Sequence, residues 1–208
     1  MSDTFYIATG SDAEGFELSR FISLLGIEPI TSATFSPDPG APLDHAWKIW
    51  QETRFLPCFA PAFVRTFHAA GTLEVDAIVA ADREVDSSLP EPIRKSSLSA
   101  GKPFLEGKSE MKGHREWIRF AAKVEGNESP GHLCVLFALQ SALYHLPLPS
   151  ALTAFAAFEF QSRRGKFPFP EMTGEENVIF SSILPRIPLA VRGNSEEIDD
   201  GKGMLRVI

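Results

Sequence analysis

Apolar residues recur along most of the chain at the three- and four-residue intervals of amphipathic helices, and alternating patterns typical of strands are scarce. A first helix is predicted over about residues 12–25, and the proline-rich segment after it is predicted to be a loop. Further helices are predicted from Asp44 as an N-cap, from a start bracketed by Pro57 and Pro61 to Gly71, over 72–86 with Thr72 as a cap, over 90–107 with a kink or break at Pro103, over 109–124, and over 176–187.

The most apolar stretch, PGHLCVLFALQSALYHLPLPSALTAFAAFEF over residues 130–160, raises the question of a membrane span. A span needs about 20 mostly apolar residues in a row. Gln140 and Glu159 interrupt this stretch, and Pro147 and Pro149 divide it in two. We therefore predict two buried helices joined by a short loop, over about residues 132–144 and 150–160.

These patterns together predict an all-α fold, a single multi-helix domain of roughly eight to ten helices. The domain is expected to occupy residues 1–190. Residues 191–208 are charged and contain glycine, so we expect a mobile C-terminal tail.

Composition and charge narrow the function classes. The chain has 208 residues with 44% hydrophobic residues and 17 Phe, enough for a sizeable core. Its net charge of −7 and the lack of a Lys/Arg block argue against a general nucleic-acid binder and against an anionic-membrane binder. The N-terminus lacks the pattern of a signal peptide, and two distant cysteines give no disulfide framework. A reduced, cytoplasmic protein is expected.

Residues that carry chemistry form no catalytic pattern. The sequence has no HExxH, no GxSxG and no phosphate-binding glycine loop. His132 and Cys134 would diverge by about 200° on a helix, so they cannot easily share a metal. Structural roles are the preferred interpretation, with His132 as a helix cap or packing residue. A helical enzyme or small-ligand binder remains an alternative, with a pocket that uses Cys58, His68, His132 or Glu159.

Charged clusters are interpreted in the same way. The acids Asp82, Glu84 and Asp86 are expected on a solvated helix face, although they could meet a basic partner. A basic group follows the second apolar helix, where cations suit a helix C-terminus and could also dock an acidic protein. Its members are Arg163, Arg164 and Lys166.

Two segments of the chain resemble the urease accessory protein UreF family. LPEPIRKSSLSAGKPFLE is similar to a family helix with an E-x-R-x-x-S pattern, and GHLCVLFALQSALYHLPLPSALTAFAAFEFQS is similar to a helix–Leu-Pro–helix stretch. With looser matches on either side, the resemblance covers roughly residues 50–190. The residues that match are Arg94, Ser97, Gly101, Leu105, His132, Val135, Phe137, Ala142, Pro147, Ala151, Leu152, Ala154 and Phe155.

The chain departs from the family pattern at both ends. The glycine pair of the family's N-terminal turn is absent, and the segment nearest to that turn reads EPITSATFSPDPG. The family's Arg-rich C-terminal tail is also absent, since the chain ends in GKGMLRVI. These departures put the contact with a UreD/UreH-type protein in question, and they suggest as a rival interpretation a paralogue of the same fold with a non-urease partner.

The resemblance implies an all-helical adaptor without catalytic activity or a cofactor of its own. Such an adaptor forms homodimers, joins a UreG-type GTPase and a UreD/UreH-type accessory protein, and helps deliver nickel to apo-urease. It would handle nickel only through that accessory complex. The residues then expected at a partner or dimer interface are Arg94, Ser97, Gly101, His132, Arg163, Arg164 and Lys166.

Overall fold

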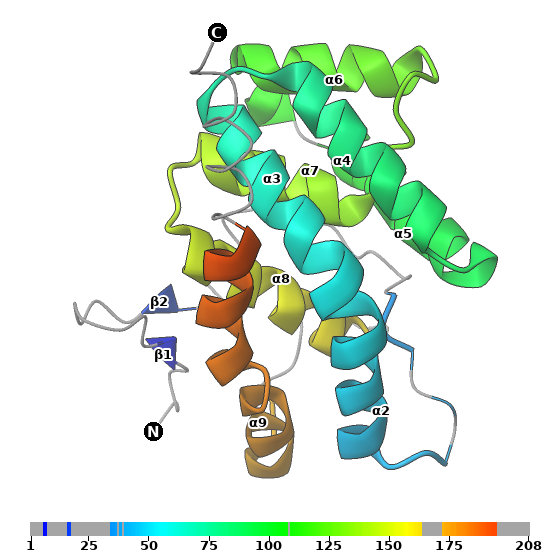
Figure 1. The fold of residues 1–208 in the computed structure, drawn as a ribbon, viewed down its shortest axis with the longest axis vertical. Helices are drawn as coiled ribbons and strands as arrows, with labels where there is room; N and C mark the ends of the chain where they lie inside the picture. The colour runs from blue at the N-terminus through cyan, green and yellow to red at the C-terminus, as the bar shows by residue number, and fades with distance from the viewer. Residues whose placement is uncertain are drawn as a thin grey trace, which may run out of the picture.

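Helices make up nearly all of the regular structure in the computed structural model, which describes residues 6–7, 16–17, 34–36, 38, 40–107, 109–163 and 172–194 (Figure 1). The all-α class is therefore confirmed. The main elements are α2 (Leu43–Trp50), the π-helical segment η1 (Gln51–Phe59), α3 (Ala60–Gly71), α4 (Val75–Ser88), α5 (Glu91–Glu106), the 3-10 helix η2 (Ser109–Gly113), α6 (Arg115–Glu125), α7 (Leu133–Leu143), α8 (Leu148–Ser162), α9 (Gly174–Ser181) and the 3-10 helix η3 (Leu184–Arg186). Residues 187–194 are also helical.

The first predicted helix, over residues 12–25, falls largely outside the described residues. The two that are described, Phe16 and Glu17, form the strand β2 (Phe16–Glu17), which pairs antiparallel with β1 (Tyr6–Ile7). The prediction is therefore wrong at these two positions. Apolar spacing over so short a run does not separate a helix from a two-residue strand, and here the ladder takes up the backbone groups.

The helix that opens the main body runs without a break from α2 through η1 to α3. Pro57 was expected to mark a helix start but lies inside η1. Proline cannot donate a backbone hydrogen bond, and a π-helical segment with its wider turn, whose bonds run to the carbonyl five residues back, tolerates that loss. Within the same segment the Thr53 carbonyl accepts a hydrogen bond from the Arg54 guanidinium at 3.0 Å. Asp44 is likewise not the N-cap, because α2 begins after Pro42 and Asp44 lies in its first turn.

The turn between α3 and α4 is a Schellman motif. The Glu74 amide donates to the Ala69 carbonyl at 2.9 Å, and the Leu73 amide donates to the Ala70 carbonyl at 3.4 Å. Leu73 occupies the left-handed position that glycine usually fills, with φ of 62°. Thr72, which was predicted to cap α4, is instead the C-cap of α3, and its hydroxyl donates to the Ala69 carbonyl at 3.3 Å.

Two further boundaries differ from the sequence prediction. α5 continues through Pro103 to Glu106, without the predicted break, and closes with a bond from the Gly107 amide to the Pro103 carbonyl at 2.9 Å. Pro103 removes the single helical bond that its own amide would have donated, and the helix continues for three more residues before it ends. The single helix predicted over 109–124 is divided into η2 and α6, and α6 begins only after His114.

The two apolar helices of the 130–160 stretch are confirmed as α7 and α8, and they form the centre of the fold. α7 packs against α3, α5 and α8, and every residue of 150–162 in α8 is buried. None of the described helices is long and apolar enough to span a membrane. An aromatic cluster at the far end of α8 joins it to α2, α9 and the segment before α2. Its members are Phe35, Trp47, Trp50, Phe160 and Phe180.

Candidate functional site

A buried aspartate anchors the loop between α6 and α7 to α4. Asp82 is fully buried, and its carboxylate accepts bonds from the Ser129 hydroxyl at 2.6 Å, the Gly131 amide at 2.6 Å and the His132 amide at 2.9 Å. Three donors on a loop without regular structure therefore converge on one helical side chain. This aspartate is the centre of what we call the polar cluster, whose members are Asp82, Asp86, Arg94, Ser97, Ser129, Gly131 and His132.

His132 connects the same loop to α4 and α5. It stands at the N-cap position of α7, and its ring is buried. Its Nδ1 lies 3.0 Å from the Ser97 hydroxyl, and its Nε2 lies 3.2 Å from an Asp86 carboxylate oxygen. The other oxygen of Asp86 lies 3.8 Å from the Arg94 guanidinium. The ring thus links two helices across its two nitrogens.

Burial controls the protonation of the polar cluster. Desolvation raises the pKa of Asp82, although its hydrogen bonds to Ser129, Gly131 and His132 act in the opposite direction. Desolvation also lowers the pKa of His132, against the opposing effects of Asp82 and Asp86. A neutral imidazole satisfies both contacts of the ring if Nε2 donates to Asp86 and Nδ1 accepts from the Ser97 hydroxyl. The arrangement holds segments together and leaves no group aimed at a substrate.

Close backbone packing accompanies the polar cluster. A Cβ added at Gly101 would lie 2.0 Å from the Gly131 carbonyl oxygen, so α5 and the loop touch backbone to backbone. Gly131 itself has φ of 86°. Four of the residues expected at an interface, Arg94, Ser97, Gly101 and His132, are therefore neighbours in one intramolecular arrangement, and the last three are buried. Their role at a partner or dimer interface remains a prediction.

The centre of the polar cluster was missed by the sequence interpretation, which placed Asp82 on a solvated face. That prediction is wrong, because Asp82 faces the core. A signal was present: Asp82 follows Ile78 by four residues and precedes Val85 by three, so it shares the apolar face of α4. Ser129 lay in a predicted turn and carried no comparable signal.

The basic group after α8 is only partly described. Arg163 is nearly buried, with its guanidinium over the Phe160 ring at 4.0 Å and paired with Glu176. It also donates to the Phe160 carbonyl. Arg163 thus connects the C-terminal end of α8 to α9, which is a structural role within the chain. Arg164 and Lys166 lie outside the described residues.

Glu159 on α8 holds the segment that precedes α2. One carboxylate oxygen accepts bonds from the Thr34 amide at 2.7 Å, the Thr34 hydroxyl at 2.9 Å and the Phe35 amide at 3.1 Å. The other oxygen is buried and has no hydrogen-bond partner among the described residues. Burial raises the pKa of Glu159 to about 7. The Trp50 indole also donates to the Thr34 hydroxyl, at 3.2 Å, so the segment is fixed from two helices.

The four residues of the alternative pocket lie in separate surroundings. His132 belongs to the polar cluster, Glu159 binds Thr34 and Phe35, and His68 lies exposed near the end of α3. Burial raises the pKa of the half-buried Cys58 to about 11, the opposite of what a nucleophilic thiolate requires. Among the described residues, no group of three or more His, Cys, Asp or Glu side chains could hold a metal ion.

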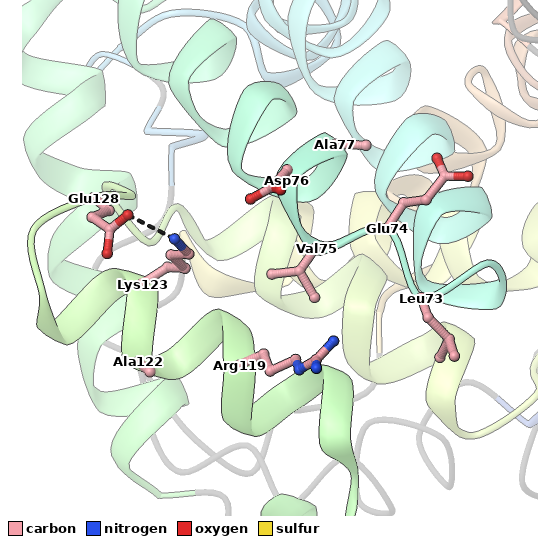
Figure 2. A pocket seen from close by; sticks show the side chains of 9 residues that line it. All are labelled: Leu73, Glu74, Val75, Asp76, Ala77, Arg119, Ala122, Lys123 and Glu128. Carbon is pink, nitrogen blue, oxygen red and sulfur yellow. Dashed lines mark hydrogen bonds and ion pairs between the residues drawn. The ribbon is translucent and has the colours of Figure 1, made fainter.

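Two surface grooves flank α6. One, of about 690 Å³, lies between the start of α4 and α6 (Figure 2). Leu73 and Glu74 form part of its α4 side, and Arg119 and Lys123 of its α6 side. Lys123 is paired with Glu128 at 2.7 Å, which raises its pKa. The other groove, of about 750 Å³, lies between α5 and α6 and reaches Gly101 and Gly131 of the polar cluster region.

These features define an all-helical protein whose buried ionisable groups hold its segments together and whose open features are surface grooves. The sequence model of the UreF family matches residues 45–158, more than half of the chain. The chain therefore belongs to the UreF family, and membership indicates a urease accessory role in general. Comparison with curated proteins and with solved structures gives no match. The matched region runs from α2 to α8 and contains the whole polar cluster.

Proposed function

We propose that this chain is a urease maturation adaptor that binds and regulates a UreG-type GTPase within an accessory complex. The observation that carries the proposal is the family match over residues 45–158. In this role the chain works in the cytoplasm as a homodimer, also contacts a UreD/UreH-type protein and apo-urease, and assists nickel insertion. Nickel is cargo of the complex, and the adaptor itself has no turnover and no resident cofactor.

The disposition of ionisable side chains supports an adaptor. Asp82, His132 and Glu159 are buried and hydrogen-bonded to other parts of the chain, so these ionisable side chains hold segments of the fold together. A protein that works by presenting surfaces needs this kind of rigid interior and does not need a pocket of activated groups. The neutral histidine and the raised thiol pKa of Cys58 agree with that interpretation.

Binding to purified partners is the direct test. The full chain is immobilised and exposed to the UreG-type GTPase and the UreD/UreH-type protein, each alone and then together. We expect stoichiometric capture of at least one of them and a change in the GTP hydrolysis rate of the captured GTPase. Failure of both proteins to bind, alone and together, would contradict the proposed function.

A cellular experiment tests nickel delivery separately. Deletion of the gene is expected to leave urease protein present but poor in nickel and inactive, and re-expression of the chain should restore both properties. Measuring the amount of urease and its nickel content in the same samples separates a failure of maturation from a failure of expression. A deletion strain with fully nickel-loaded urease would count against the proposal.

The missing N-terminal glycine pair motivates a second candidate, a paralogue of the same fold with a non-urease partner. It predicts that the chain binds a GTPase or an accessory protein from outside urease maturation and leaves urease nickel content unchanged. The deletion experiment above separates the two candidates.

A further inference from the structure

The groove between α4 and α6 contains two features that the fold does not require. The first is Leu73, which has φ of 62° and is 54% exposed. A bulky side chain in the left-handed region is uncommon, and glycine or asparagine would occupy this turn with less strain. A large apolar side chain therefore stands at a strained backbone position although about half of it faces solvent.

The second feature is Arg119, in the middle of α6. Its side chain is exposed and lines the groove, and no hydrogen bond or ion pair joins it to another described residue. Lys123, one turn further along α6, is by contrast paired with Glu128. Figure 2 shows Arg119 reaching along the groove toward Leu73, while the Glu74 carboxylate is directed away from it. The Arg119 guanidinium is therefore available to pair with an anion from outside the described part of the chain.

We propose that this groove, centred on Leu73 and Arg119, is a docking site for a segment of a urease accessory protein that presents a carboxylate beside an apolar side chain. The carboxylate pairs with the Arg119 guanidinium, as a planar donor group favours. The apolar side chain packs on Leu73 and on the neighbouring Val75 and Ala122, which also line the groove. Charge complementarity with Arg119 selects the acidic segment. This inference rests on the proposed function, since it names where the partner binds.

The acids of the opposite wall limit which segment fits. Asp76 and Glu128 face Lys123, so the cation and the acids at that end of the groove offset one another. A partner with a long run of acids would be repelled there. The expected segment carries a single carboxylate positioned at Arg119, next to its apolar anchor.

Two variants with matched controls test this site through binding of the full chain to the UreG-type GTPase and the UreD/UreH-type protein. Leu73→Asn removes the anchor, and Arg119→Glu reverses the charge. The control for charge is Arg115→Glu, one turn earlier on the same exposed face and outside the groove. The control for lost apolar surface is Leu189→Asn, since Leu189 is 67% exposed and lies far along the chain.

We expect each groove variant to weaken binding of at least one partner by about tenfold or more, as anchor residues do, while both control variants bind as the wild type does. Thermal unfolding supplies the second readout: Leu73→Asn should keep the melting temperature or raise it by up to about 3 °C, because the strained position is relieved. A loss of binding without a loss of stability identifies Leu73 as an anchor and not as a fold residue.

Three outcomes would overturn the inference. If the wild type binds a partner and both groove variants bind it equally well, the groove is not the docking site, and the proposed function is unaffected. If Arg115→Glu weakens partner binding as much as Arg119→Glu does, the effect of Arg119→Glu comes from the overall charge of the surface and not from a specific contact in the groove. Absence of any binding by the wild-type chain defeats the proposed function and, with it, the docking site.

Discussion

Glu159 makes the stability of this protein depend on pH in a direction that is unusual for a carboxylate. It is fully buried in α8, and within the part of the chain that the structure describes three donors reach one of its oxygens and none reaches the other. Glu159→Gln keeps the shape and one carbonyl oxygen able to accept from the Thr34 and Phe35 amides, but it cannot ionise. This substitution therefore separates the effect of charge from the effect of hydrogen bonding.

The magnitude follows from the pKa. Burial raises the pKa of Glu159 from the ordinary value of 4.5 to about 7 in the folded chain. Between these values the folded chain holds a proton that the unfolded chain has lost, so the free energy of unfolding falls as pH rises. The stabilisation is fully present below about pH 4.5 and lost once pH passes about 7. At about 1.36 kcal/mol per pH unit the loss is about 3 kcal/mol.

Urea unfolding followed by far-UV circular dichroism, between about pH 5 and pH 8, measures this loss. Two other buried groups also have shifted pKa values. The raised pKa of Asp82 makes the free energy of unfolding fall as pH rises through its own titration, whereas the lowered pKa of His132 acts in the opposite direction, because the unfolded chain then binds the extra proton. The difference between wild type and Glu159→Gln cancels both and isolates Glu159.

We expect the free energy of unfolding of the wild type, measured relative to that of Glu159→Gln, to fall as pH rises through the titration of Glu159. Above about pH 7 the variant should therefore be at least as stable as the wild type, and below that pH its relative gain should disappear. Glu159→Leu is the companion variant: it leaves the amides of Thr34 and Phe35 without an acceptor, at a cost of about 2–4 kcal/mol at every pH. If the wild type and Glu159→Gln show parallel pH profiles, Glu159 does not titrate in this range and the reasoning is refuted.

Three other substitutions test the packing, each by urea unfolding. Gly101→Ala should destabilise by about 3 kcal/mol or more because its Cβ would meet the Gly131 carbonyl oxygen, and Gly71→Ala, with open space around it, is the control; equal effects would show that the close approach is absent. Asp82→Ala should cost about 3–5 kcal/mol by stranding three buried donors, and a cost below about 1 kcal/mol would show that the loop is held by other contacts. Pro57→Ala should stabilise by about 1 kcal/mol, since it restores an amide donor; a loss would mean that the π-helical segment requires the proline.

The helical fold was predictable because apolar periodicity survives most local irregularity. The two helices of residues 130–160 follow from Pro147 and Pro149 and from the unbroken apolar faces on either side. The continuous helix through Pro57 was not predictable, because a proline in a sequence signals a break and only the π-helical geometry of η1 avoids it. The strand at Phe16–Glu17 depends on a partner segment that periodicity does not reveal.

The candidate site was predictable in some of its members but not in its centre or in its arrangement. Ser97, Gly101 and His132 were selected from a family pattern, and they lie together around Asp82, which the pattern did not include. Reading the helix face of Asp82 would have placed it in the core, yet its donors come from a loop 47 to 50 residues away. Contacts between residues so far apart in the sequence depend on how α4, α5 and α7 pack together, and the residue pattern of a single sequence does not reveal that packing.

The buried carboxylates and the exposed groove residues of this chain are expected to behave differently when they are substituted. Asp82 and Glu159 each hold an irregular segment on a buried helix, so substituting them should change stability and affect partner binding only through the fold. Arg119 makes no hydrogen bond or ion pair with another described residue, and Leu73 stands exposed at a left-handed position that glycine or asparagine would occupy with less strain. Under the proposed function, residues of the second kind contact the partner. When stability and partner binding are measured on the same variants, substitutions of Asp82 and Glu159 should lower stability, and substitutions of Arg119 and Leu73 should weaken binding without lowering stability. An Arg119 variant that lost stability would contradict this division.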